Sequence, residues 1–242
     1  MHTDLPPISE IWVYLSGSPL LALVLTLSAY LLGLTLYERS ERNPLANPVL
    51  IAVILVTLSI NMLDMPYAKY FEGSQFVHFL LGTATVSLAI PIYKGFASLK
   101  GRMGILMISL LAGGVTSVFT AIGMARWLGV DEALVRGLVA KSVTAPIAMG
   151  IAERVQASPT LTAIFAVSTG ILGTVLGRYV LDVLRITAWW QRGFALGVAA
   201  HGIGTSRAFS VHPEAGAYAS LGMGLHGILG AVLIPYAVAW WF

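Results

Sequence analysis

The first candidate for chemistry is a polar run in an apolar chain, G-L-V-A-K-S-V-T-A-P-I-A-M-G-I-A-E at residues 137–153. Its polar and helix-breaking residues lie within six positions of each other: Lys141, Ser142, Thr144 and Pro146. Pro146 has no backbone N–H, and its ring disfavours a helical conformation at the preceding residue. Unpaired backbone groups at membrane depth are tolerated only beside protein or a water-filled cavity. We therefore expect a broken helix that faces a cavity, as in many transporter substrate sites.

The same pattern occurs 55 positions earlier, at residues 82–97. The two copies share G-x4-S-x3-P-I-x2-G-x-A, and the first copy adds three candidate site residues, Thr85, Ser87 and Pro91. Paired Gly/Pro-interrupted segments are a sequence-level pointer to a transporter binding site. The alternative is chance matching in a chain rich in Gly, Ala and Ile.

Hydroxyls in these two segments are candidate ligands for a small anion. For any single Ser or Thr, the ordinary alternative is a hydrogen bond to a carbonyl in its own helix. Beside a helix-breaking proline, we favour the ligand role for Ser142 and Thr144. Lys141 is costly in a membrane unless it pairs, lines a cavity or reaches the interface. It could attract a carboxylate, and extension towards the interface is an equal alternative.

A third run, G-V-A-A-H-G-I-G-T-S-R-A at residues 197–208, places an imidazole between small residues. His201 could bind a carboxylate or carry a coupling proton, and the alternative is a hydrogen bond between helices. Gly202 and Gly204 allow close backbone approach, and Thr205 would help to shape the pocket. Arg207 either binds an anion or marks the membrane surface.

Composition excludes several classes of protein. Of the 242 residues, 57% are apolar and only 10% are charged, against about 25% charged residues in soluble domains. This is the composition of an integral membrane protein. The absence of cysteine excludes disulfides and thiolate metal sites, and the dispersed histidines predict no metal site. We expect no cofactor, and the formal charge of +3 is too small to suggest nucleic-acid binding.

The hydropathy pattern predicts an all-α polytopic membrane protein with seven or eight membrane segments, two of them the interrupted helices. Residues 1–17 are expected to form an N-terminal surface segment, and residues 18–242 a single membrane domain. Residues 178–192 carry four charges and two tryptophans, which predicts a separate interfacial stretch. The expected segments are 18–37, 49–63, 76–93, 103–125, 133–153, 159–177, 193–209 and 215–242.

Several of these runs resemble the LrgB/CidB family. K-S-V-T-A-P-I-A at 141–148 is similar to that family's K-S-V-T-T-P-I-A, and the run at 197–208 to its G-x-A-S-H-x-I-G-T-A-R-A. The runs A-T-V-S-L-A-I-P-I-Y-K at 84–94 and E-x-G-A-x-x-S-L at 214–221 also fit. The resemblance extends from about residue 47 to the C-terminus. Alanine replaces the family's usual Pro, Thr and Ser at three positions, Ala140, Ala145 and Ala200.

The resemblance implies two functions. Bacterial members are described as antiholin-like regulators of murein hydrolase activity and cell lysis, often with a small LrgA/CidA-type membrane partner. The plant relative is a plastid glycolate/glycerate translocator, and bacterial relatives have been linked to pyruvate movement. Our first hypothesis is a secondary transporter of small monocarboxylates such as glycolate, glycerate or pyruvate. The alternative is an antiholin-like regulator that acts through its partner.

Under either hypothesis we expect a multi-pass, homo-oligomeric protein of the cell inner (plasma) membrane, in contact with the lipid bilayer. An enzyme is not expected. The sequence has no H-E-x-x-H run, no usable Ser/His/Asp set and no paired intramembrane acids.

Overall fold

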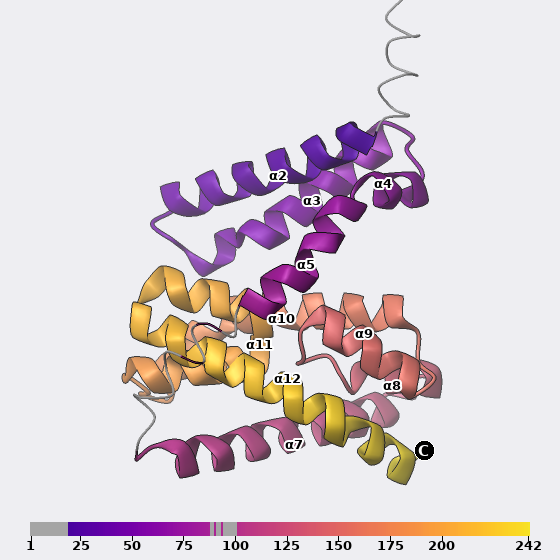
Figure 1. The fold of residues 1–242 in the computed structure, drawn as a ribbon. Helices are drawn as coiled ribbons and strands as arrows, with labels where there is room; N and C mark the ends of the chain where they lie inside the picture. Colours follow the sequence, from indigo (N-terminus) through magenta and orange to yellow (C-terminus); the bar gives the residue numbers. More distant parts are fainter. Residues whose placement is uncertain (1–18, 88–89, 91–92, 94–100) are drawn as a thin grey trace, which may run out of the picture. The chain divides into compact units, whose positions relative to one another are not determined.

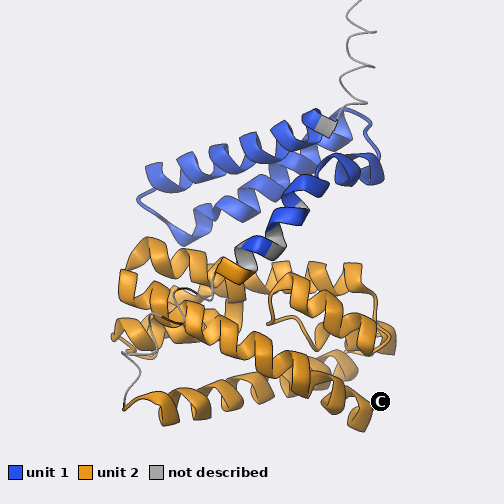
Figure 2. Ribbon diagram, viewed as in Figure 1, with its two compact units in different colours: residues 1–84 blue, residues 85–242 orange. Residues whose placement is uncertain are grey.

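The structure is a computed structural model that describes residues 19–87, 90, 93 and 101–242. Its chain divides into two compact units, residues 1–84 and residues 85–242 (Figure 2). All regular structure in the described part is helical (Figure 1), which confirms the all-α prediction. The predicted N-terminal surface segment at 1–17 lies outside the described residues.

Unit 1 is built on two apolar helices that lie side by side, α2 (Pro19–Arg39) and α3 (Pro48–Met62). A 3-10 turn at Pro44–Ala46 joins them. α3 begins where it does because the Asn47 side chain accepts hydrogen bonds from two backbone N–H groups of its first turn. A short helix, α4 (Tyr67–Gly73), packs against α2, and the next helix, α5 (Gln75–Ser87), runs across the boundary between the units.

Unit 2 contains the helices that carry the candidate site. In chain order they are α7 (Met103–Trp127), α8 (Glu132–Leu138), α9 (Ala145–Arg154), α10 (Pro159–Val183), α11 (Trp189–Val211) and α12 (Pro213–Trp241). α11 and α12 pack along each other, α10 packs on α11, and α9 packs on α10 and α12 (Figure 1). α7 contacts α8, α11 and α12. A buried apolar cluster joins α7, α8, α9, α10 and α12, and a second joins α7, α11 and α12.

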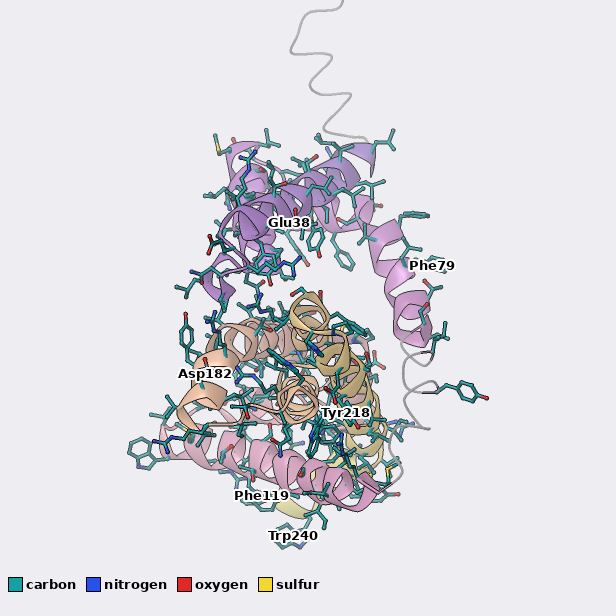
Figure 3. All side chains as sticks on the ribbon, turned by 90° about the vertical axis from the view of Figure 1, so that its left-hand side faces the viewer. Glu38, Phe79, Phe119, Asp182, Tyr218 and Trp240 are labelled. Carbon is teal, nitrogen blue, oxygen red and sulfur yellow. The ribbon has the colours of Figure 1, made fainter. Side chains whose placement is uncertain are left out.

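Four described helices are long and apolar enough to cross a membrane: Leu20–Arg39, Met103–Trp127, Pro159–Val183 and Pro213–Trp241. α3 is apolar but shorter. Large apolar side chains on these helices are widely exposed; Figure 3 shows Phe119 and Trp240 pointing outward. Such a surface suits lipid contact, so the chain is a membrane protein. The finer prediction of seven or eight segments, two of them interrupted, stays a prediction.

The predicted bounds of the stretch at 178–192 are wrong, and its placement at the membrane interface stays a prediction. α10 continues through Arg178 and Asp182 to Val183, and α11 begins at Trp189. Arg178 and Asp182 form an i,i+4 ion pair with 3.7 Å between Nε and Oδ2, a spacing that supports a helix. Charges in the last turns therefore do not end α10. The helix ends where Arg185 takes a left-handed conformation with φ 55°.

The contact between α11 and α12 depends on glycines. A Cβ atom added at Gly197 would lie 2.0 Å from the carbonyl oxygen of Ala219, and one at Gly193 equally close to that of Ala215. No side chain fits at that distance. The two helices therefore pack with their backbones in direct contact, as small residues allow in membrane proteins.

We predict that Gly197→Ala lowers the stability of the fold, because the new methyl group would meet the backbone of α12. Overpacking typically costs about 1–3 kcal/mol. Gly123→Ala is the matched control, since Gly123 also lies in a helix and nothing lies within 4 Å of its added Cβ. Thermal unfolding in detergent, followed by tryptophan fluorescence, measures both. A Gly197→Ala protein that melts no lower than Gly123→Ala would contradict the close packing.

Candidate functional site

A cavity of about 820 Å³ lies within unit 2, between α7, α10, α11 and the turns that follow α8. Most of its lining is apolar, including Leu106, Leu172 and Phe194. The polar side chains that line it come from four separate segments: Ser109, Thr116 and Ser117 from α7, Lys141 and Ser142 from the turns, Thr169 from α10, and Gln191 from α11. The fold thus gathers polar groups that are far apart in the sequence.

The turns that carry Lys141 and Ser142 arise where the sequence predicts a broken helix. α8 ends at Leu138 and α9 begins at Ala145, with a proline in its first turn. Tight turns connect them: the Lys141 N–H donates to the Leu138 carbonyl at 3.1 Å, and the Val143 N–H donates to the Ala140 carbonyl at 3.0 Å. Residues 142–144 are buried. The non-helical backbone is therefore enclosed by protein, as an apolar surrounding requires.

Lys141 and two serines form a compact polar cluster on the cavity wall. The Lys141 Nζ donates to the Ser117 hydroxyl at 2.8 Å and lies 3.2 Å from the Ser142 hydroxyl. The two hydroxyl oxygens lie 2.8 Å apart, so one donates to the other. Each member of this Lys–Ser–Ser cluster, Lys141 with Ser117 and Ser142, is thus oriented by the other two.

The cluster carries a positive charge without an acidic partner among the described residues of the cavity wall. Among the described residues that line the cavity, no aspartate or glutamate faces the Lys141 ammonium, and no ion pair in the described part of the chain includes it. A charge in apolar surroundings is costly unless a counter-charge or hydrogen bonds compensate for it. The cavity can therefore accommodate a small anion beside one ammonium and two hydroxyls.

Ser117 is a residue that the sequence-based prediction missed. It comes from the middle of α7, an apolar helix that we expected to be an ordinary span. The available signal was the pair Thr116–Ser117, which follows two glycines in an otherwise apolar run. Single hydroxyls in membrane spans usually bond to their own helix, as that of Thr120 does. The Ser117 hydroxyl instead bonds to Lys141 and Ser142, because α7 packs against the turns that carry them.

His201 occupies a second break, inside α11. Its backbone has φ 40° and ψ −129°, which interrupts the helix without a proline. The imidazole is buried, and its Nε2 lies 2.8 Å from the carbonyl oxygen of Ala166 on α10. This is the interhelical hydrogen bond that the sequence suggested as the alternative. His201 is not among the residues that line the cavity, and its role as a ligand or proton carrier stays a prediction.

Small residues around His201 allow the close contacts that the interruption of α11 requires. A Cβ atom at Gly170 of α10 would lie 2.7 Å from the imidazole Cε1, so the ring is held against a bare backbone. Gly204 lies so close to Leu196 of its own helix that a Cβ there would meet the Leu196 carbonyl oxygen at 2.5 Å. The Thr205 hydroxyl donates to the His201 carbonyl at 2.8 Å. Gly204 and Thr205 thus support the bend in α11.

The remaining predicted site residues lie apart from the cluster. Thr144 is buried next to the turns, and its hydroxyl has no hydrogen-bond partner in the described part of the chain. Gly202 follows the bend and has open space around it apart from the Met223 sulfur at 3.9 Å. Arg207 lines a different pocket. None of these three residues lines the large cavity.

The first copy of the repeat contributes little to the described geometry. Ser87, the last residue of α5, is exposed, and Thr83 donates its hydroxyl to the Leu80 carbonyl of its own helix. The side chain of Thr85 and the whole of Pro91 lie outside the described residues. The symmetric pair of broken helices, with Pro146 in one and Pro91 in the other, therefore stays a prediction.

Membrane-length helices, with a mostly apolar cavity between them that carries a few polar side chains, define a polytopic helical membrane protein. A model of the LrgB-like family matches residues 26–240, and the chain belongs to that family. It is 33% identical over 220 residues to the Bacillus subtilis protein YwbG, covering 91% of this chain and 97% of YwbG. It is 28% identical over 218 residues to the holin-like protein CidB of Staphylococcus epidermidis, covering 90% and 95% of the two chains. No solved structure matches significantly.

We predict that the cavity is open to water and favours anions. The chain has no cysteine, so one introduced thiol can report on one position. Ser109→Cys, on the cavity wall, should react faster with an anionic thiosulfonate reagent than with a cationic one, because Lys141 attracts the anion. Adding Lys141→Met should remove that preference.

The neighbouring Ile108 is the control position. Its side chain is 69% exposed and is not part of the cavity wall, so Ile108→Cys should face lipid and react slowly with both reagents. Equal reaction of Ser109→Cys with both reagents, or equal reactivity of the two cysteines, would rule out a water-filled, anion-attracting cavity.

Proposed function

We propose that this protein is a secondary carrier of small monocarboxylates, of the glycolate, glycerate or pyruvate class, in the cell inner (plasma) membrane. The observation that supports this most directly is the Lys–Ser–Ser cluster. An ammonium within 3.2 Å of two hydroxyls, on a cavity wall with no acid among its described lining residues, suits a carboxylate.

The chemistry of binding would be simple. A carboxylate has two acceptor oxygens and no donor, which matches the ammonium of Lys141 and the hydroxyls of Ser117 and Ser142. Hydrogen bonds to charged groups are worth roughly 1.5–3 kcal/mol each. Apolar lining residues such as Leu106 and Phe194 would strengthen this attraction by lowering the effective dielectric constant around the cluster.

The hydroxyl or keto group of the substrate has further partners nearby. Thr116 and Ser109 of α7 and Thr169 of α10 line the same cavity. A two- or three-carbon acid is much smaller than about 820 Å³, so water would accompany it. Specificity would then come from a few polar contacts and not from a close-fitting shape.

Transport also requires that the site open in turn to each side of the membrane. The turns between α8 and α9 and the bend at His201 are the described places where helices are interrupted. Such positions absorb changes in φ and ψ when helices move. We propose that the segments on either side of them rearrange around the bound carboxylate, with His201 as a carrier of the coupling proton.

The second candidate function comes from the names of the relatives. Staphylococcal relatives are named holin-like protein CidB, which favours an antiholin-like role in regulating murein hydrolases and lysis. In that role the chain would act with an LrgA/CidA-type membrane partner or as a homo-oligomer. The relatives reported above do not carry the name of an enzyme, and we propose no catalytic activity.

Counterflow of radiolabelled glycolate and pyruvate in liposomes distinguishes the two functions. For the carrier, Lys141→Met should lower the rate of exchange at least about tenfold, because one charge-assisted contact is lost. Ser117→Ala should lower it less, since Lys141 and Ser142 remain. Because the hydrogen bond between Lys141 and Ser117 also joins α7 to the turns between α8 and α9, each exchange rate is compared per amount of folded protein.

Thr120→Ala is the matched control. It removes a hydroxyl from the same helix, α7, at a residue whose hydroxyl bonds only within that helix in the described structure. Exchange should be unaffected. If folded wild-type protein exchanges none of a panel of short carboxylates, the carrier proposal is wrong and the lysis-regulating role becomes the better account.

A further inference from the structure

A second pocket, of about 450 Å³, lies in unit 2 where the last turns of α10 meet two parts of α11. It shares no lining residue with the large cavity. Its lining contains three arginines from separate places, Arg178 near the end of α10, Arg192 near the start of α11, and Arg207 beyond the bend at His201. Asp182 is the one acid among its described lining residues.

The charges in this pocket do not balance. Arg178 and Arg192 share the single carboxylate of Asp182, so the formal charge of the described lining residues is positive. Asp182, labelled in Figure 3, is already engaged: its Oδ1 lies 2.7 Å from Arg192 and its Oδ2 lies 3.7 Å from Arg178. An anion with more than one acceptor oxygen would suit two guanidinium groups that share one carboxylate.

Arg192 and Arg178 differ in how firmly they are held. Arg192 is held in place, because it also donates to the Ile186 carbonyl at 2.8 Å and lies 6.0 Å from the centre of the Trp189 ring. Within the described part of the chain, the contact found for Arg178 is the long one to Asp182, and its side chain is 57% exposed, so it can turn towards a ligand. Guanidinium groups present paired N–H donors that match phosphate oxygens.

The position of the pocket suits the depth of lipid headgroups. It lies at the end of a candidate membrane span, Pro159–Val183. Trp189, on its wall, is 38% exposed, and tryptophans favour the membrane interface. Val183 and Leu184, between the charged residues, are strongly exposed and apolar. A phosphate in the pocket would therefore have acyl-compatible surface beside it.

We propose that this pocket binds a phosphate group, which either an anionic lipid headgroup or a soluble phosphorylated compound supplies. The site is separate from the carboxylate cavity and does not depend on the proposed transport. Arg178, Arg192 and Arg207 hold the phosphate oxygens, and Asp182 keeps Arg192 in position. Because Arg207 lies beyond the bend at His201, a bound phosphate also ties the second half of α11 to the end of α10.

Two binding experiments on the full chain in detergent distinguish the sources of the phosphate. The lipid arm compares phosphatidylglycerol with a diacylglycerol of the same chains by native mass spectrometry. The soluble arm compares glycerol 3-phosphate with glycerol through tryptophan fluorescence, since Trp189 lines the pocket. In at least one arm, the phosphate-bearing probe should bind about tenfold more tightly than its partner.

Arg178→Gln and Arg207→Gln should each weaken that binding about tenfold. Arg185→Gln is the control, because Arg185 is exposed, lies between α10 and α11, and does not line the pocket. It removes the same charge and should change binding less than about twofold. If Arg207→Gln does not fold, the test is made with Arg178→Gln, whose side chain is exposed.

A preference in the lipid arm supports the site with a membrane lipid as its ligand, and a preference in the soluble arm supports it with a soluble ligand. The proposal is overturned if neither phosphate-bearing probe binds more tightly than its phosphate-free partner. It is equally overturned if Arg185→Gln weakens binding as much as Arg178→Gln, because general attraction to positive charge would then explain the result.

Discussion

The hydrogen bonds of the Lys141 ammonium are the interaction on which the arrangement of unit 2 depends. A lysine among apolar helices is costly unless its charge is compensated. Here the compensation comes from Ser117 and Ser142. For Ser117 to accept this hydrogen bond, α7 must lie against the turns between α8 and α9. The bond therefore joins two segments that are more than twenty positions apart in the sequence. The large cavity lies beside this contact, between α7, α10 and α11.

The glycine contacts are the second constraint. α10, α11 and α12 approach so closely that Gly170, Gly197 and Gly193 have no room for a side chain. Close approach lets the helices pack through van der Waals contacts between their backbones. Large apolar side chains can then lie on the outer faces, which suits contact with lipid. It also fixes the His201 imidazole against α10 through the Ala166 carbonyl. The bend in α11 therefore contacts α10 through His201, and the turn of α11 before it contacts α12 through Gly197.

Two pockets that contain basic side chains lie along different parts of the α10–α11 pair. The large cavity includes Thr169 and Gly173 of α10, whereas the smaller pocket includes Thr174 and Arg178. The bend at His201 lies in the same pair of helices. A protein of the LrgB-like family thus combines an internal anion-compatible cavity with a separate arginine-lined pocket.

The sequence alone was sufficient for the fold class, the membrane character, the family and the change of direction near Pro146, because composition and proline geometry are local properties. It also singled out Lys141 and Ser142, which the structure places on the cavity wall, and their role as site residues stays a prediction. It could not identify Ser117, because a hydroxyl in an apolar helix has the same local signature whether it faces its own backbone or a lysine. It ended a membrane segment at 177, six residues too early, since an ion pair one helical turn apart and the charges beyond a helix end look alike in sequence. Only the tertiary structure decided these points, because they depend on which helix lies opposite, and that is set by contacts between residues distant in the chain.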